Sequence, residues 1–279
     1  ECIHQQSAQQ FARWGDALAR ALGEPLELDY VPRVPPTTAL TLVARQNYRE
    51  HSDEPTAILR FAWPAQGGGA LRGHGLAHFS AGDLVGIVAP GSAVPRYYSL
   101  ASGWRDGFVE ICVRQMPGGL CSTHLLGLAP GGSVQAFVRP NPGFALGRSR
   151  RSVVLIGAGT GVAPLAGFIR RNEGHKPMFL YFGGRDPACD DYFGPEIAQW
   201  QQQGRVAGVT KVFSRIPRGG GYVQDALRRD AEHVRGLLAH GALVRVCGSQ
   251  AMARGVAQAL DELLAPLQLS VQQHKAEER

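Results

Sequence analysis

The sequence predicts two domains: an antiparallel β-barrel, followed by a parallel sheet with helices on both faces. The length of 279 residues suits two domains of roughly 100–200 residues each. From Leu40 to about Val138, short β-rich runs alternate with Gly and Pro turns, which is typical of a barrel. After residue 148, apolar strands alternate with helices, which indicates a parallel sheet.

The composition excludes several protein classes. Glycine is enriched, with 36 residues, against an average usage of roughly 7%. The glycines have no period of three, which excludes collagen, and the 44% hydrophobic content excludes bulk disorder. No apolar run approaches the ~20 residues that cross a bilayer. The sequence therefore predicts a soluble globular protein without a membrane span.

The net charge and the cysteine pattern limit which binding partners, metal sites and disulfides the chain is expected to have. The net charge is +6, but no basic stretch is interleaved with aromatic residues, so we expect no nucleic-acid binding. A basic surface attracts anionic nucleotides or an acidic protein. The odd number of cysteines, without a CxxC pair, argues against a disulfide scaffold, a zinc site or an iron–sulfur cluster. We expect a cytoplasmic location, as a separate chain or as the cytoplasmic portion of a larger, membrane-tethered protein. The cysteines are Cys2, Cys112, Cys121, Cys189 and Cys247.

The first elements are a helix and a connector. Residues 3–23 carry apolar side chains at helical spacing, and Gly23 is a plausible C-terminal stop. Residues 30–36 are rich in proline and predict an extended segment. The expected barrel strands then cover residues 40–45, 57–63, 84–88, 108–114 and 133–138.

In the second half, Val153–Ile156 is wholly apolar, as expected for a strand buried on both faces. The remaining expected strands are 178–182, 208–213 and 243–247, and the expected helices are 195–203, 223–240 and 252–264.

A glycine-rich turn follows the first of these strands. Gly157, Gly159 and Gly161 lead directly into a helix, whose N-terminal amides favour a pyrophosphate. Their G-x-G-x-G spacing differs from the Rossmann G-x-G-x-x-G fingerprint. Taken alone, the turn is compatible with a nucleotide site or with a purely structural role.

Two segments of the barrel half carry binding chemistry. In Arg96-Tyr-Tyr-Ser99, an arginine could clamp a diphosphate, an aromatic side chain could stack on a planar ring and the hydroxyl could bond the edge of that ring. The alternative is an ordinary strand with a solvated arginine. In residues 118–124, Ser122 or Thr123 suits a helix N-cap, where free amides could hold a phosphate.

Two segments of the parallel half end at the carboxyl edge of the sheet, where such folds bind ligands. The segment after residue 213 contains cationic, hydroxyl and aromatic side chains. Together they could bind a ligand that carries a phosphate next to an aromatic ring. They are Ser214, Arg215, Arg218, Tyr222 and Gln224. Cys247 ends the last strand at the same edge; a buried structural cysteine is the alternative.

In this order, the motifs resemble the ferredoxin–NADP reductase superfamily and, more closely, its diflavin branch, such as cytochrome P450 reductase and the sulfite reductase flavoprotein. The matching segments span about residues 40–265. They are Arg96–Ser99, Gly119–Ser122, Gly157–Pro164, Tyr181–Arg185, Phe213–Arg215, Tyr222–Gln224 and Cys247-Gly248.

The resemblance implies three regions. They are an N-terminal helix and linker (1–36), an FAD-binding β-barrel (37–148) and an NADP-binding α/β domain (149–279). It also implies that hydride passes from NADPH to FAD, with Ser99 and Cys247 as the catalytic residues. The residues that it implies for cofactor binding are Arg96, Tyr97, Tyr98, Ser99, Cys112, Val113, Gly119, Leu120, Cys121, Ser122, Thr123, Gly157, Gly159, Thr160, Gly161, Arg185, Ser214, Arg215, Arg218, Tyr222, Gln224 and Cys247.

The expected function is an FAD-dependent, NADPH-oxidising reductase module that passes electrons to a separate acceptor. That acceptor is an FMN (flavodoxin-like) or haem domain, in the same parent chain or outside it. Two alternatives stay open: a stand-alone NAD(P)H flavin or ferric-chelate reductase, and a catalytically silent flavin-binding sensor.

The chain departs from the family pattern at four places. Gly82-Asp83 and Arg96 are too close for the usual helical insertion, and Gly219–Gly221 replaces a basic residue before Tyr222. Ser249 stands where an acidic residue is usual, and the usual aromatic terminal segment does not follow Lys275–Arg279.

Overall fold

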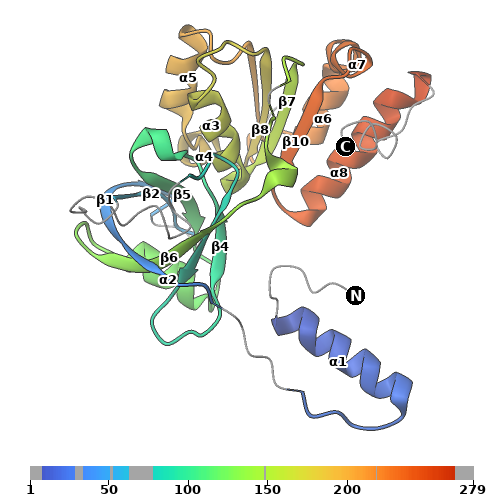
Figure 1. Cartoon of the computed structure of the whole chain (residues 1–279). Coiled ribbons are helices and arrows are strands. Elements are labelled where there is room, and N and C mark those ends of the chain that lie inside the picture. Colours follow the sequence, from blue (N-terminus) through green and yellow to red (C-terminus); the bar gives the residue numbers. More distant parts are fainter. Residues whose placement is uncertain are drawn as a thin grey trace.

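A computed structural model gives the fold as two β-sheets with their helices (Figure 1). It describes residues 8–28, 34–50, 53–62, 78–147, 149–217 and 219–267. The expected helix near the N-terminus is present as α1 (Ala8–Leu22), and it stands apart from the sheets. Gly23 adopts φ +72°, the left-handed conformation that commonly ends a helix. The start of that predicted helix, residues 3–7, and residues 30–33 of the connector lie outside the described residues.

The first sheet has six antiparallel strands in the order β4-β3-β6-β1-β2-β5. Beyond β4, the backbone amide of Ala101 donates to the carbonyl of Glu110 on β5 at 2.8 Å. This bond joins the two edges of the sheet, which curls around an apolar interior and confirms the predicted barrel. The strands are β1 (Thr38–Tyr48), β2 (Thr56–Ala62), β3 (Leu84–Val88), β4 (Arg96–Ser99), β5 (Val109–Arg114) and β6 (Ser133–Arg139).

Helix α2 (Leu120–Gly127) follows β5 and begins earlier than the sequence predicted, with Gly119 as its N-cap. The prediction of Ser122 or Thr123 as the N-cap was therefore wrong. The hydroxyl of Ser122 instead lies inside the first turn. It accepts from the Met116 amide at 3.1 Å and donates to the Gly119 carbonyl at 3.0 Å, so it closes the loop that leads into the helix.

The second sheet is parallel, with strand order β10-β7-β8-β9. Helices α3 and α5 pack on one face, and α6, α7 and α8 pack on the other (Figure 1). This arrangement confirms the predicted α/β architecture. The elements are β7 (Val153–Ala158), α3 (Val162–Arg170), β8 (Met178–Gly184), α4 (Pro187–Asp190), α5 (Gly194–Gln202), β9 (Gly208–Phe213), α6 (Val223–Arg229), α7 (Ala231–Ala239), β10 (Leu243–Cys247) and α8 (Gln250–Leu264).

Strand β7 is buried on both faces, as its unbroken apolar sequence predicted. Val153 and Leu155 lie in the core under α3 and α5, whereas Val154 and Ile156 lie in the core under α6 and α8. The alternation follows from the two-residue period of a strand.

The single helix expected over residues 223–240 is in fact two helices, α6 and α7, separated at Asp230. The apolar spacing continues through the break, so periodicity alone could not reveal it. In the structure, the carboxylate of Asp230 accepts a hydrogen bond from the Tyr181 hydroxyl on β8, which fixes the break above the sheet.

Helix α3 joins the two halves of the molecule. A Cβ at Gly167 would lie 2.6 Å from the Ala81 Cβ and 2.7 Å from the Ala101 carbonyl, so the helix touches the barrel through a bare backbone. One turn later, Arg170 donates to the Ala101 carbonyl at 2.8 Å and forms an ion pair with buried Glu110. A continuous apolar core also spans the junction, because Ile58 and Cys112 of the barrel belong to the same cluster as α3.

Within the described part of the chain, no helix combines the length and the apolar character that a membrane span requires.

Candidate functional site

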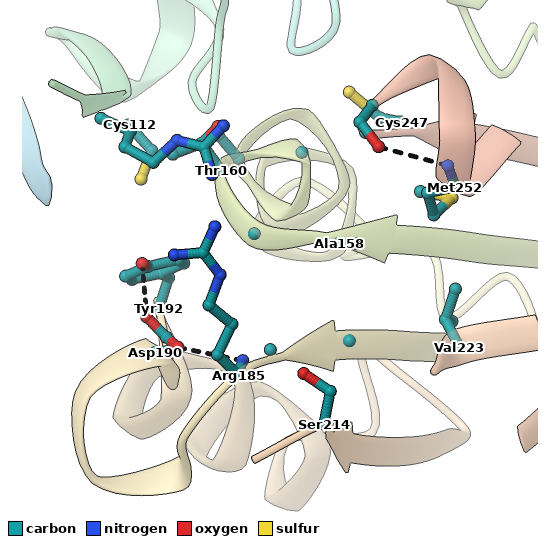
Figure 2. A pocket seen from close by; sticks show the side chains of 18 of the residues that line it. Cys112, Ala158, Thr160, Arg185, Asp190, Tyr192, Ser214, Val223, Cys247 and Met252 are labelled. Atoms are coloured by element: carbon teal, nitrogen blue, oxygen red, sulfur yellow. Dashed lines mark hydrogen bonds between the residues drawn. The ribbon is translucent and has the colours of Figure 1, made fainter. Parts of the chain in front are cut away.

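A cavity of about 900 Å³ lies where the barrel meets the carboxyl edge of the parallel sheet (Figure 2). The strand order explains its place. From β7 the chain passes to β8 and β9, and then returns to β10 on the other side of β7. The strand order therefore reverses between β7 and β10, and open α/β sheets bind ligands outside such a point.

The glycine-rich turn forms the floor of this cavity. Gly159 has φ +56°, and Gly159, Thr160 and Gly161 line the space. A Cβ at Gly161 would lie 2.1 Å from the Cys247 carbonyl oxygen, so only glycine permits β7 and β10 to meet here. Gly157 does not line the cavity. Its missing side chain makes room for Leu165 of α3, whose Cδ1 would lie 2.8 Å from a Cβ.

The two predicted catalytic residues come together from different sheets. Ser99 ends β4 of the barrel and Cys247 ends β10 of the parallel sheet, and both side chains line the cavity. Burial raises the pKa of the Cys247 thiol to about 11, and the nearby Ser99 hydroxyl opposes this shift only in part. The thiol is therefore neutral at pH 7.

Aromatic and thiol groups of the barrel form the adjoining wall. Tyr97, Tyr98 and Cys112 line the cavity. Burial raises the pKa of Tyr98, whose ring packs on the core cluster that contains Cys121. Tyr98 therefore stands between the cavity and the start of α2.

The remaining predicted barrel residues do not line the cavity. Val113 is wholly buried inside the barrel, and Arg96 is exposed at the start of β4. Arg96 pairs with Ile87 of β3, whose carbonyl accepts from the Cys121 thiol at 4.0 Å, so the start of β4 lies beside the start of α2. The first turn of α2 and its cap are formed by Gly119, Leu120, Cys121, Ser122 and Thr123. The first amides of a helix lack intrahelical acceptors, so they could hold an anion beside Arg96.

Polar residues of the parallel half line the far end of the cavity. Ser214 and Arg215 follow β9, whereas Tyr222 and Gln224 stand at the start of α6. Tyr222 exposes 62% of its surface, so its ring is available for stacking. Arg218 lies outside the described residues. Ser249 caps α8, because its hydroxyl accepts the Met252 amide at 3.2 Å.

A charged cluster that no sequence motif indicated lies on the cavity wall, at the junction of the two halves. Arg49 follows β1, Glu54 lies in the β1–β2 loop and Asp190 ends α4. Arg114, which ends β5, and Tyr192, which follows α4, complete the set. Arg49 and Asp190 are 141 residues apart, so no local pattern could have paired them.

Asp190 is the buried centre of that cluster. Its carboxylate accepts from the Tyr192 hydroxyl at 2.8 Å, from the Arg185 and Asp186 amides at 2.9 and 3.0 Å, and from Arg49 at 3.2 Å (Figure 2). Burial on its own would raise the pKa of Asp190, but these hydrogen bonds outweigh it and lower the pKa. The carboxylate is thus held ionised at the junction.

Residues 155–258 match the family model described as the oxidoreductase NAD-binding domain. The bifunctional cytochrome P450/NADPH–P450 reductase of Gibberella moniliformis is 35% identical over 174 residues, which cover 57% of this chain and 15% of that protein. The inducible nitric oxide synthase of Bos taurus is 35% identical over 210 residues, with coverages of 66% and 18%. The ferredoxin–NADP⁺ reductase of Plasmodium falciparum, solved with 2′P-AMP, matches with a TM-score of 0.66 at 17% identity, over 81% of this chain and 93% of that one.

Residues 155–258 are therefore similar to an oxidoreductase NAD-binding domain, and the chain has the fold of a ferredoxin–NADP⁺ reductase. The structural match shows the shared fold, and the sequence relatives agree with the branch that the motifs indicated. The chain spans less than a fifth of the length of these sequence relatives.

The residues present fit a dinucleotide better than a metal ion. Gly159 and Gly161 leave backbone without side chains at the carboxyl edge, so a diphosphate could approach it closely. In the described ranges, no group of three or more His, Cys, Asp and Glu side chains is placed to hold a metal ion.

Proposed function

We propose that this chain is an FAD-containing module that oxidises NADPH and passes the electrons to a separate acceptor. The convergence of Ser99 and Cys247 on one cavity carries this proposal. Each residue ends a strand of a different sheet, so a ring held by the barrel and a ring held by the parallel sheet would face each other in this cavity. In this assignment, residues 37–148 bind FAD and residues 149–279 bind NADPH.

When bound, FAD supplies a ring system that accepts a hydride from the nicotinamide, which needs no strong acid or base from the protein. The residues of this chain would hold the two rings and their phosphates in place. Tyr98 offers a flat face beside the cavity, the glycine turn offers backbone amides to a diphosphate, and Ser214, Arg215 and Tyr222 offer groups that suit a ribose phosphate. Because the Cys247 thiol is neutral, it places no negative charge beside the point of transfer.

The acceptor that we infer is an FMN or haem domain. Two relatives support this, since one is a bifunctional cytochrome P450/NADPH–P450 reductase and the other is a nitric oxide synthase. The chain matches only part of each, which leaves the remainder of those proteins for other roles.

An anaerobic titration with NADPH tests the proposal. The purified protein, loaded with FAD, should lose its flavin absorbance at about 450 nm when NADPH is added. NADH should bleach it more slowly, because it lacks the phosphate that the Arg215 end of the cavity would bind. Unbleached flavin would favour a silent sensor. Fast turnover with free flavin or ferric chelates, with no gain from a protein acceptor, would favour a stand-alone reductase.

Replacing Ser99 tests the position of transfer. In stopped-flow experiments, Ser99→Ala should slow flavin reduction about tenfold, the effect of one hydrogen bond at the reacting centre, while NADP⁺ binding is retained. Ser133→Ala, an exposed serine at the start of β6 outside the cavity, is the matched control. Reduction of Ser99→Ala at the wild-type rate would sink the assignment of Ser99.

A further inference from the structure

The cavity wall at the junction carries three arginines and two carboxylates. Arg49, Arg114 and Arg185 line the cavity together with Glu54 and Asp190. The function proposed above requires such cations, because a phosphorylated dinucleotide brings several negative charges. Which of the arginines can serve a ligand depends on the carboxylate that already holds each one.

The pair formed by Arg49 and Asp190 is a fixed part of the fold. Asp190 is 3% exposed, and both of its oxygens lie 3.2 Å from an Arg49 nitrogen. The same carboxylate also binds two backbone amides and Tyr192. A ligand could take Arg49 only by leaving a buried charge without its partner, which is strongly unfavourable.

Glu54 is held quite differently. Its side chain is 29% exposed, in the loop between β1 and β2. It accepts a hydrogen bond from Arg185, and one of its oxygens lies 3.9 Å from Arg114. One partly exposed carboxylate therefore faces two cavity arginines, and their side chains are themselves 35% and 39% exposed.

The Arg185 side of this contact is anchored without Glu54. The Arg185 amide donates to Asp190 at 2.9 Å, so the start of its side chain stays at the cavity wall when its guanidinium changes partner. The hydrogen bond from Arg185 lowers the pKa of Glu54, so Glu54 stays ionised at neutral pH and competes as an anion. Replacing Glu54 by a ligand anion costs little free energy, because a partly exposed ion pair contributes little to stability.

We propose that Glu54 is an internal counter-anion that occupies Arg185 and Arg114 until the phosphate of an incoming dinucleotide displaces it. This inference rests on the proposed function. Glu54 is then a specificity-determining residue. It weakens the binding of every anionic ligand, and it does so least for ligands with enough negative charge to displace it.

Calorimetric titration of the FAD-loaded protein with NADP⁺ and with inorganic pyrophosphate tests this. In low salt, Glu54→Gln should bind both ligands about fivefold more tightly than wild type, which is the size expected for removing one partly exposed competing charge. The gain should disappear at about 0.5 M salt, where exposed charges are screened. The substitution keeps the shape of the side chain, and an unchanged melting temperature would show that the fold is intact.

Two variants make the test specific. Asp53→Asn removes an exposed neighbouring carboxylate, and it should leave the NADP⁺ affinity within twofold of wild type. In an Arg185→Met background, Glu54→Gln should give a gain of less than twofold, because the contested cation is gone.

The outcomes separate this inference from the proposed function. Equal NADP⁺ affinity of wild type and Glu54→Gln would overturn the inference and leave the function standing. Equal gains in Glu54→Gln and Asp53→Asn would also overturn it, since the effect would then be general electrostatics. Absence of NADP⁺ binding to every variant would overturn both.

Discussion

Cys247 belongs to the parallel sheet but lines the same cavity as the barrel residue Ser99. Its thiol is buried near Ser99, and its carbonyl oxygen occupies the space that a side chain on Gly161 would need. A cysteine here is small enough to leave room for a ring. Because it is uncharged at neutral pH, it adds no pH dependence of its own between pH 6 and 9.

Alkylation by iodoacetamide should report this pKa. With a pKa of about 11, only about one thiol in 3,000 is ionised at pH 7.5, so labelling of Cys247 should be slow and should rise about tenfold per pH unit up to about pH 10. The nearby Ser99 hydroxyl lowers the pKa, so Ser99→Ala should be labelled more slowly at any given pH.

Mass spectrometry of peptides labelled between pH 7 and 10 measures the rate, and half-exposed Cys189 on α4 serves as an internal reference. A rate for Cys247 that levels off near pH 8 would contradict the raised pKa.

Single residues differ in how well the sequence predicted them. Gly159, Thr160 and Cys247 stand beside recognisable strand ends, and all three line the cavity. Arg49 and Glu54 have no such marker, because the contacts that make them notable are with Asp190 and Arg185, which are 141 and 131 residues away. Local sequence patterns can therefore reveal functional residues within one segment, but not the ion pairs that form between distant segments at the junction.

Helix α3 is the element that sets the distance between the halves. Its buried side chains pack on β7, while Gly167 faces the barrel at backbone distance. A glycine inside a helix usually costs stability relative to alanine, so its presence here is explained by the close approach and not by helix propensity.

Two glycine-to-alanine substitutions should therefore act in opposite directions. Gly167→Ala should destabilise the protein by about 1–3 kcal/mol, because the new methyl group would overlap Ala81 and Ala101. Gly236→Ala, at an exposed position of α7 with nothing within 4 Å of the new Cβ, should stabilise it by about 0.5–1 kcal/mol. Urea unfolding followed by circular dichroism measures both, and a stabilised Gly167→Ala protein would show that α3 does not pack as closely as described.

Most elements could be predicted from the sequence, and those that could not have identifiable causes. Strands β3, β9 and β10 have the predicted bounds, because each is a short run rich in valine and other strand-forming residues between clear breaks. The break between α6 and α7 depends on the Tyr181 hydrogen bond to Asp230, a contact across 49 residues. The early start of α2 depends on a hydroxyl that closes its own loop.

For the whole molecule, two of the ionic contacts between the barrel and the parallel half involve buried carboxylates. Arg170 on α3 pairs with Glu110 on β5, and Arg49 after β1 pairs with Asp190 on α4. Both carboxylates are buried, so each contact is costly to break. Together with the shared apolar core, they hold the cavity walls in one arrangement.

Asp190→Asn should destabilise the protein by about 3 kcal/mol at pH 7, because it removes the charge of a buried carboxylate that pairs with Arg49. The pKa of Asp190 is lowered by folding, so its contribution is complete above the unfolded-state pKa of about 3.9 and is lost as the pH falls through the lower folded value. The gap between wild type and variant should therefore shrink below about pH 4.

Melting temperatures at pH 7, 5 and 3 measure that gap. Glu262→Gln, which breaks the exposed pair with Arg228 on α6, is the control and should leave the melting temperature nearly unchanged. A gap that stays constant from pH 7 to pH 3 would contradict the role assigned to Asp190.

The strand order has a consequence for how the protein is made. Strand β10 is the last strand of the chain, yet it pairs with β7, the first strand of its sheet, so that Cys247 lies opposite Gly157. During synthesis, the barrel and the glycine turn emerge long before the strand that completes the cavity. A chain cut anywhere before residue 243 would lack Cys247 and the strand that completes the cavity. On the function proposed above, such an incomplete chain would not oxidise NADPH.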